Sequence, residues 1–321
     1  MSALVAIGAT TPASAASGVG YTIIAFDGCA LARVDLATGA TTVLGSWSSD
    51  ACVFDLAFTP DGSALYGVRV QKGEVGSTAT LVQFDPTTGA TTDLGPVGDF
   101  PLGGPGFDQG NLTFANDGTP YTYLVPAGEE PIPQSSGGPT AAATVVPPEC
   151  DGSAFCLFRL NLADPTSLTY VNHVPQEVTV YYGLATSCAG STVSAHSGFL
   201  PASQSAWPSG PNAAAPAGQT LASVNLTSTG AATTDIGPVT VGRLSSLDFD
   251  SAGTLYGVGY DGSSVPSVFT VDPATGANTK VADLVIDDIL EFEVLGFAVA
   301  HPCTPAPQPA ADVVVAPRFT G

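Results

Sequence analysis

The sequence predicts an all-β protein, a β-propeller, and two alternating repeats together with a turn-rich composition are the observations that predict it. The chain of 321 residues holds 37 Gly and 27 Pro but 7 Lys plus Arg, as turn-rich, helix-poor chains do. Repeats of this kind are the sequence signature of a repeat fold such as a propeller. The first repeat reads Asp-x-x-Thr-Gly and starts at Asp35, Asp85 and Asp272, with looser copies at Asn161 and Asn225.

Each copy of this first repeat predicts a β-hairpin. A short apolar run such as Leu31–Val34 precedes it, and Thr-rich residues such as Thr41–Leu44 follow. The Asp or Asn side chain accepts hydrogen bonds from backbone N–H groups two residues on, and the Gly supplies the positive φ that closes a tight turn. We expect this turn to join the outer two strands of a blade, at the rim.

The second repeat predicts the inner two strands of each blade. It runs from an apolar strand through an Asp-Gly-like turn into Leu-Tyr-Gly-Val, and its clear copies are 56–68 and 247–258. The segment 112–121 is a third copy, and 181–194 is a degenerate fourth. Two hairpins give four antiparallel strands, which is one propeller blade.

Counting the repeats predicts five four-stranded blades. Four blades begin near Val53, Asn111, Tyr181 and Leu244, and the fifth has only its first strand, 294–300. The N-terminal segments 21–26, 31–34 and 41–44 supply the missing three strands, so strands from both chain ends close the last blade. This closure removes the exposed sheet edges that promote aggregation. Six blades are the alternative, because the third blade is irregular and the connections are long.

The chain ends predict export. Residues 1–17 resemble the end of an export signal, with an apolar run and the small-x-small sequence Ala13-Ser14-Ala15. Residues 18–303 then form the propeller, and 304–321 form a Pro-rich tail or linker. No other stretch approaches the ~20 apolar residues of a membrane span, so we expect a secreted or cell-surface protein without membrane insertion.

Six cysteines agree with export, because an even number in such a chain indicates disulfides. Cys150 and Cys156 are close enough in sequence to close a local loop. Cys29 and Cys52 are expected on one face of the ring, and Cys188 and Cys303 on the other. The pattern therefore favours the pairs Cys29–Cys52, Cys150–Cys156 and Cys188–Cys303. A zinc site is the weaker reading, because no Cys-x-x-Cys is present.

The formal net charge of −21 argues against polyanionic binding partners. Nucleic acid and anionic membranes both demand basic patches, which this chain cannot supply. An acidic surface keeps a secreted protein soluble and favours cations.

Candidate site residues follow from the expected geometry, because propellers bind ligands at the channel mouth, where the inner strands begin. The ligand-binding candidates at these positions are Asp50, Asp55, Asp108, Asn111, Tyr182 and Arg243, with Ser246 beside them. Trp207, in a Pro-rich connection, is a further candidate for recognition. The densest acidic cluster is Asp287, Asp288, Glu291 and Glu293, whose oxygens suit Ca²⁺. The same carboxylates are open to two other readings, as the acid and base of a glycosidase or as ordinary solvated loop residues.

Other catalytic signatures are missing from the sequence. There is no Gly-x-Ser-x-Gly elbow and no His-Glu-x-x-His. His173 and His301 have no evident nucleophile beside them, and His196 is expected to be an exposed turn residue.

The alternating repeats, Leu-Tyr-Gly-Val and Val-Asp-Pro-Ala-Thr-Gly-Ala-x-Thr, resemble those of uncharacterised β-propeller domains in secreted and surface proteins of bacteria. The resemblance covers about residues 20–301, and it implies a fold rather than a function. We rank three hypotheses: a non-catalytic binding or adhesion module for a glycan or surface protein, then a carbohydrate-active or ester hydrolase, then a self-assembling surface protein. Calcium is the one cofactor that the sequence suggests.

Overall fold

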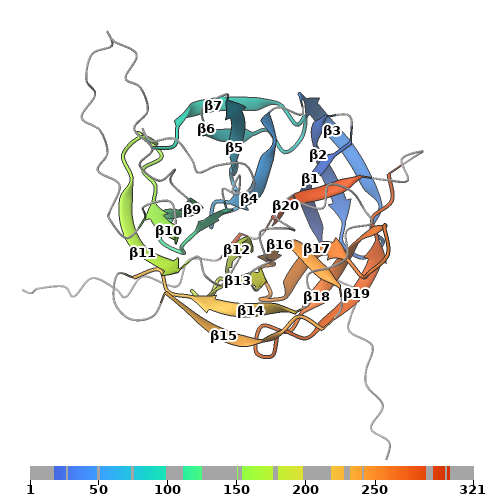
Figure 1. Cartoon of the computed structure of the whole chain (residues 1–321). Coiled ribbons are helices and arrows are strands. Elements are labelled where there is room, and N and C mark those ends of the chain that lie inside the picture. The colour runs from blue at the N-terminus through green and yellow to red at the C-terminus, as the bar shows by residue number, and fades with distance from the viewer. Residues whose placement is uncertain are drawn as a thin grey trace, which may run out of the picture.

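The computed structural model describes residues 18–26, 28–48, 51–73, 76–98, 111–124, 150, 154–175, 180–197, 218–227, 232–240, 242–286, 292–300 and 302–303. Its twenty strands form five four-stranded antiparallel sheets, arranged as the blades of a β-propeller (Figure 1). The described residues thus confirm the five-bladed fold. The predicted boundaries at residues 17 and 303 stay predictions.

Blade 1 consists of β4 (Val53–Phe58), β5 (Leu65–Gly73), β6 (Gly76–Phe84) and β7 (Thr91–Pro96). Blade 2 consists of β8 (Asn111–Phe114), β9 (Pro120–Leu124), β10 (Ala154–Arg159) and β11 (Thr169–Pro175). Blade 3 consists of β12 (Val180–Thr186), β13 (Thr192–Ser197), β14 (Gln219–Val224) and β15 (Thr233–Pro238). Blade 4 consists of β16 (Arg243–Phe249), β17 (Leu255–Tyr260), β18 (Pro266–Val271) and β19 (Asn278–Asp283).

The closing blade joins the two ends of the chain, as predicted. Its inner strand is β20 (Glu293–Val299), and its other strands are β1 (Val19–Ala25), β2 (Cys29–Asp35) and β3 (Thr41–Trp47). Strands β20 and β1 pair antiparallel, with Ala25 opposite Glu293 and Gly20 opposite Val299. The ring is therefore held shut by a β-ladder between residues from the two ends of the chain.

The inner strands β20, β4, β8, β12 and β16 follow one another around the axis, and β3, β7, β11, β15 and β19 lie at the periphery (Figure 1). We call the face where the inner strands begin the entry face and the opposite one the exit face. Because the strands alternate in direction, the turns between the inner two strands of each blade lie at the exit face. The Asp-x-x-Thr-Gly turns between the outer two strands lie at the rim, where they contact the preceding blade's outer strand or the residues after it. The connections between repeats leave from the entry face.

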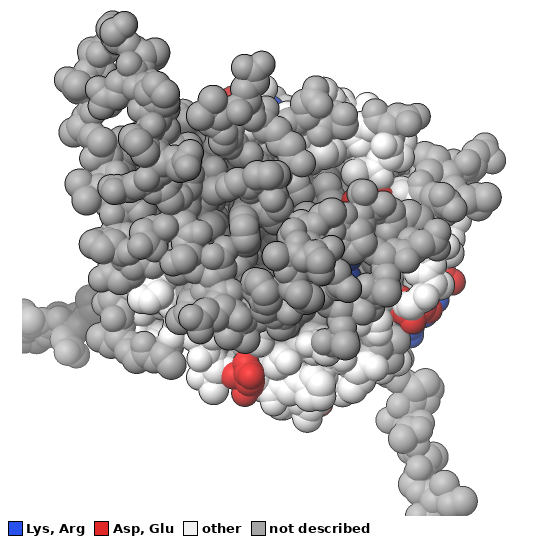
Figure 2. Space-filling view, in the orientation of Figure 1, with Lys and Arg blue, Asp and Glu red and all other residues white. Residues whose placement is uncertain are grey.

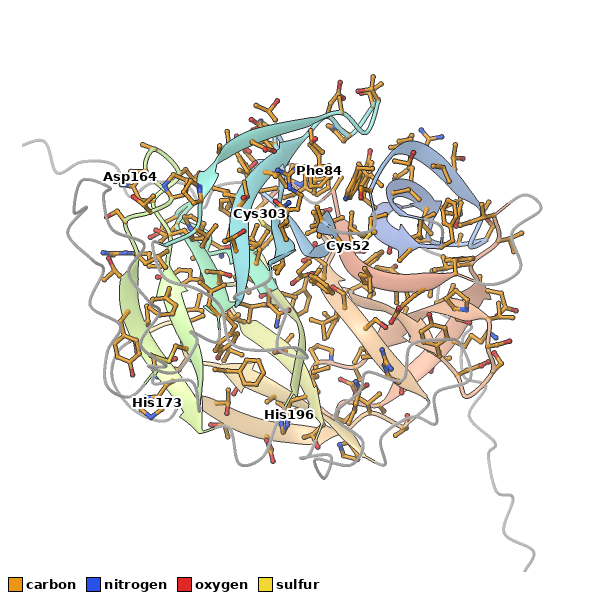
Figure 3. The ribbon with its side chains drawn as sticks, turned by 45° about the horizontal axis from the view of Figure 1, so that its top comes forward. Cys52, Phe84, Asp164, His173, His196 and Cys303 are labelled. Carbon is orange, nitrogen blue, oxygen red and sulfur yellow. A yellow bond between two sulfur atoms is a disulfide. The ribbon has the colours of Figure 1, made fainter. Side chains whose placement is uncertain are left out.

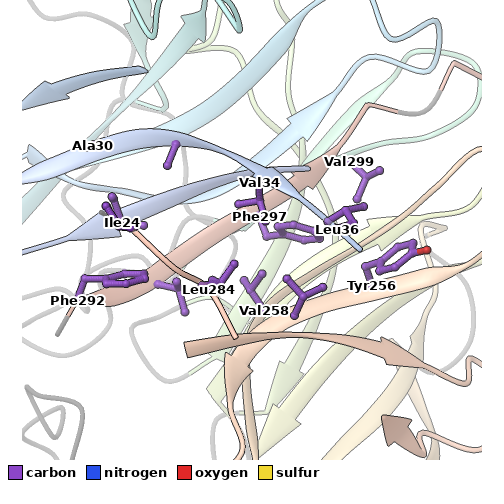
Figure 4. Packing of buried hydrophobic residues seen from close by; sticks show 14 residues of the cluster. Ile24, Ala30, Val34, Leu36, Tyr256, Val258, Leu284, Phe292, Phe297 and Val299 are labelled. Atoms are coloured by element: carbon purple, nitrogen blue, oxygen red, sulfur yellow. The ribbon is translucent and has the colours of Figure 1, made fainter. Parts of the chain in front are cut away.

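The core lies between blades, where alternate residues of facing sheets pack against each other. Figure 4 shows one such cluster, in which Ile24, Val34 and Phe297 of the closing blade meet Tyr256 and Val258 of blade 4. Equivalent clusters join the other blades, for example Leu81 of blade 1 with Leu112 of blade 2. Burial between blades therefore stabilises the ring as a whole.

The Asp-x-x-Thr-Gly turn lies between the outer two strands of its blade, as predicted. In blade 1 the Asp85 carboxylate accepts the N–H of Thr87 at 2.7 Å, and Gly89 donates its N–H to the Asp85 carbonyl at 2.8 Å. Gly89 has a φ of 72°, in the left-handed region that favours glycine. Backbone N–H groups of the turn hold the pKa of this carboxyl below its usual value.

The same turn is also a joint between blades. A Cβ at Gly89 would lie 2.5 Å from the backbone nitrogen of Gly45 in the preceding blade's outer strand, far inside contact distance. The other full copies, Gly39 and Gly276, approach the outer strands of their preceding blades in the same way. At Gly39 the joint includes hydrogen bonds, because Val285 donates to the Gly39 carbonyl and accepts from Thr41, both at 3.0 Å.

The three disulfides join the pairs that we predicted. Cys29–Cys52 ties β2 of the closing blade to the segment before β4, at the entry face. Cys188–Cys303 ties the β12–β13 turn to the residues after β20, at the exit face. Cys150–Cys156 closes a short loop before and within β10. The first two bridges link different blades, so they reinforce closure of the ring.

Candidate binding site at the channel mouth

The structure describes the side chains of Asp55, Asn111, Arg243 and Glu293 among the predicted site residues. Tyr182 lies in β12, and only its backbone is described. The remaining candidates lie outside the described residues: Asp50, Asp108, Trp207, Asp287, Asp288 and Glu291.

Asp55 lies within β4 rather than at the mouth, and it is fully buried. One carboxylate oxygen accepts the Leu56 N–H at 3.0 Å and the Ser246 hydroxyl at 2.7 Å, and the other accepts the Leu112 N–H at 3.2 Å. Strands β4 and β16 are not neighbours in the ring, so the bond from Ser246 crosses the channel. Asp55 thereby connects blades 1, 2 and 4.

Burial raises the pKa of Asp55 to about 8, against the lowering effect of these three hydrogen bonds. The nearby charge of Asp248 also raises it. Asp248, which our sequence analysis did not single out, is buried in β16 and accepts the Val299 N–H of β20 at 2.8 Å. These two acids are therefore parts of the inner ring, and neither presents an open carboxylate to solvent.

Close packing of the inner strands completes this part of the channel. A Cβ at Gly296 of β20 would lie 2.8 Å from the Cα of Asp55, so the two strands approach too closely for any side chain. On the other side of the ring the hydroxyls of Thr113 in β8 and Thr186 in β12 lie 3.0 Å apart. Below the mouth, the inner ring is thus filled by short contacts between strands.

The mouth itself brings together Arg243, Glu293 and Tyr260. Arg243 and Glu293 are the first residues of β16 and β20, and Tyr260 lies opposite Arg243 in β17. The Tyr260 hydroxyl donates to the Phe292 carbonyl at 3.2 Å and accepts from the Val294 N–H at 3.4 Å. The two partners flank Glu293 in the sequence, so these bonds hold the Tyr260 hydroxyl beside Glu293.

The electrostatics of these three residues are coupled. Burial raises the pKa of Glu293, and the charge of Arg243 opposes that rise. Burial, with the negative charge of Glu293, raises the pKa of Tyr260 to about 12. Arg243 is buried, whereas Glu293 is partly exposed. Glu293 is therefore the residue of this pair that reaches solvent, with Arg243 and Tyr260 beside it.

Gln219 supports the mouth from the neighbouring blade, although its sequence context gave no sign of it. Its buried side-chain amide donates to the Leu244 carbonyl at 2.9 Å and accepts from the Leu244 N–H at 2.6 Å. Gln219 thus extends the hydrogen bonding of β16 next to Arg243. Asn111, the first residue of β8, is buried at the same level.

Our expectation that His196 is an exposed turn residue was wrong. His196 lies in β13, is 8% exposed, and has its Nε2 2.9 Å from a carboxylate oxygen of Asp235. The degenerate repeat concealed the strand, so the period of alternation was misread there. His173 lies in β11 of another blade, apart from His196 in Figure 3, with Nδ1 2.7 Å from the Tyr170 hydroxyl.

The metal prediction stays a prediction. Within the described residues no group of three His, Cys, Asp or Glu side chains is arranged to hold a metal ion. Glu293 is the one described member of the acidic cluster that we proposed for Ca²⁺.

The entry face carries the longest connections of the chain. Strand ends on this face are joined by the three longest connections, 97–110, 125–153 and 198–218. The turns within the repeats are mostly tight, such as 59–64 and 85–90. Loops on a rigid scaffold are where binding residues concentrate.

Figure 2 shows that the described surface of one face is largely uncharged, with acidic side chains in a few small groups. Within the described residues, no helix is long and apolar enough to cross a membrane.

No protein-family model matches the chain, and no curated protein matches its sequence. Among solved structures, it is similar to the exo-β-1,3-galactanase of Phanerochaete chrysosporium, with 14% identity and a TM-score of 0.52. That match covers 83% of this chain and 61% of the galactanase chain. A gluconolactonase from Xanthomonas campestris is 16% identical, covered over 76% of its chain and 83% of this one, with a TM-score of 0.40.

These likenesses are too distant to carry a function. This chain spans less than two thirds of the length of the galactanase that it matches. The first likeness agrees with the fold established by the sheets and their order, and the chain is a five-bladed β-propeller.

Proposed function

We propose that the protein is a secreted, non-catalytic binding module that takes its ligand, a glycan or a surface protein, at the entry face. The observation that carries the proposal is that the three longest connections, 97–110, 125–153 and 198–218, all join strand ends on that face. The Asp-x-x-Thr-Gly turns at the rim, by contrast, are engaged in joints between blades.

The mouth offers chemistry for recognition. Glu293 is a partly exposed acid, and Arg243 and Tyr260 lie next to it. A carboxylate accepts hydrogen bonds from sugar hydroxyls or from the N–H groups of a protein partner, and charge-assisted bonds of this kind are about twice as strong as neutral ones. Three disulfides are consistent with an extracellular setting.

The test is binding of the full chain to an immobilised glycan array and to bacterial surface-protein extracts. Glu293→Gln keeps the size of the side chain but removes its charge, so we expect at least tenfold weaker binding. Arg33→Gln, an exposed arginine on the closing blade, serves as the control and should bind as the wild type does. Wild-type binding that Glu293→Gln leaves unchanged would refute the mouth as the site.

Hydrolysis is the second candidate, and one observation favours it. Burial raises the pKa of both Asp55 and Glu293, and a general acid at neutral pH needs such a raised pKa. The full engagement of the Asp55 oxygens argues for the binding role instead, because a catalytic acid must reach its substrate. Turnover of nitrophenyl glycosides or esters that is lost in Glu293→Gln would reverse this ranking.

A further inference from the structure

A pocket of about 480 Å³ opens in blade 2, away from the channel mouth. It lies between the β8–β9 turn and the β10–β11 turn; Asp164, labelled in Figure 3, belongs to the latter. Its volume falls within the range of about 300–1,000 Å³ that is usual for small-molecule sites. Every residue that lines it belongs to the described part of the chain.

The exposed lining of this pocket is mostly polar. Pro120 and Leu160 are buried there, and Leu162 is partly buried. Exposed polar side chains surround them, namely Asp117, Arg159, Asn161, Ser167 and Thr169. A lining of this kind suits a ligand that is rich in hydroxyl groups, which both donate and accept hydrogen bonds.

Arg159 and Asp117 are the two charges of the pocket. The Asp117 carboxylate accepts the Thr119 N–H at 2.9 Å, which fixes its orientation in the turn. Among the described residues, the guanidinium of Arg159 forms no hydrogen bond or ion pair, and it interacts with Asp117 and Tyr121 only through its charge. The pocket therefore holds a preset acceptor and an uncommitted donor.

The repeats provide an internal comparison for Arg159. Arg33 holds the equivalent position in the closing blade, since Leu31-Ala-Arg-Val-Asp35 matches Leu157-Phe-Arg-Leu-Asn161. Each arginine also faces a tyrosine on the strand beside it, Tyr21 and Tyr121. The closing blade has no turn between β20 and β1, because those strands come from opposite chain ends. It therefore has no counterpart of Asp117, and the pocket belongs to blade 2 in particular.

We propose that this pocket is a second binding site, for a neutral saccharide. Asp117 would repel an anion and Arg159 a cation, whereas vicinal hydroxyls match both, accepting from the guanidinium and donating to the carboxylate. The net charge of −21 further disfavours anionic ligands. Leu162 is the partly buried apolar residue that a sugar ring can contact, and the hydroxyls of Ser167 and Thr169 both donate and accept.

Saturation-transfer NMR of the full chain with glucose, galactose and mannose tests this site, with glucuronate and glucosamine as charged comparators. We expect binding of at least one neutral sugar with a Kd on the order of 1 mM, and weaker binding of both charged ones. Arg159→Gln should weaken the neutral sugar at least tenfold, and Asp117→Asn, which keeps the acceptor for Thr119, should weaken it several-fold.

Arg33→Gln is the matched control and should bind like the wild type, and the thermal unfolding of each variant confirms the fold. The proposal is overturned if no neutral sugar binds, if glucuronate or glucosamine binds more tightly, or if Arg159→Gln and Arg33→Gln behave alike. Sugar binding that is lost in Glu293→Gln but kept in Arg159→Gln would assign the sugar to the channel mouth, and would also overturn it.

Discussion

Replacing Asp55 by Asn should remove a pH dependence of stability that this one carboxyl imposes on the ring. Asp55 is fully buried, and burial raises its pKa from 3.8 to about 8. A neutral carboxyl is tolerated at this position because the Ser246 hydroxyl, which donates to the ionised carboxylate, can instead accept a hydrogen bond from the protonated one. In the unfolded chain, Asp55 would ionise near pH 4.

The sign follows from proton binding. Between about pH 4 and pH 8 the folded state keeps a proton on Asp55 that the unfolded state has lost, so the free energy of unfolding falls as the pH rises. The slope is about 1.4 kcal/mol per pH unit, and the total over this window is about 5–6 kcal/mol. Below this window both states are protonated, and above it both are ionised, so the contribution is flat on either side.

The assay is urea unfolding of the wild type and Asp55→Asn at pH 4.5, 6, 7 and 8.5. Asn cannot ionise, and its amide group leaves one of the backbone N–H donors without an acceptor, at a cost of about 1–3 kcal/mol. We therefore expect the variant to be less stable at pH 4.5 and to overtake the wild type as the pH rises. A difference between the two proteins that stays constant across this range would show that Asp55 is ionised with an ordinary pKa, and the reasoning would fail.

Two further predictions concern the joints that close the ring. Gly89→Ala should destabilise the protein more than Gly118→Ala. Both glycines have positive φ, which costs alanine about 1–2 kcal/mol. A Cβ at Gly89 would also meet the backbone of Gly45, which adds about 1–3 kcal/mol by overpacking, whereas a Cβ at Gly118 would meet nothing. Equal losses of stability in chemical denaturation would show that the Gly89 turn is not a joint between blades. Replacing Cys188 and Cys303 by Ser should cost about 5 kcal/mol, against about 2 kcal/mol for Cys150 and Cys156, because the loops span 115 and 6 residues; a larger loss for the short loop in thermal unfolding would contradict it.

The fold could be predicted because the turns of each blade are specified by short local sequence motifs. The Asp-x-x-Thr-Gly phrase fixes its own hairpin through hydrogen bonds within five residues, as Asp85 with Thr87 and Gly89 shows. Strand positions then follow from alternation between the turns. The disulfide pairs followed in turn, because the order of strands assigns each cysteine to a face.

The inner ring could not be read in the same way. Ser246 meets Asp55 across the channel at a sequence separation of 191 residues, and no local pattern records that contact. At the sequence level Asp55 resembled any other acid near a channel mouth. Its burial depends on how closely β4, β8 and β16 approach the axis, which is set by packing of all five blades. Gln219 and Asp248 escaped notice for the same reason.

These contacts imply that the rim turns and the entry-face connections tolerate different changes in sequence. At the rim the Asp-x-x-Thr-Gly turns are joints, so a change such as a side chain at Gly89 displaces the neighbouring blade. On the entry face the long connections join strands whose register is already fixed by the blades on either side. Changes in length there leave the ladders and the interblade clusters intact, since loop closure costs little more as a loop grows. The repeats are therefore expected to stay regular where blades contact each other and to diverge in the entry-face connections. Blade 2 is an exception, because its two turns also line the pocket beside Arg159.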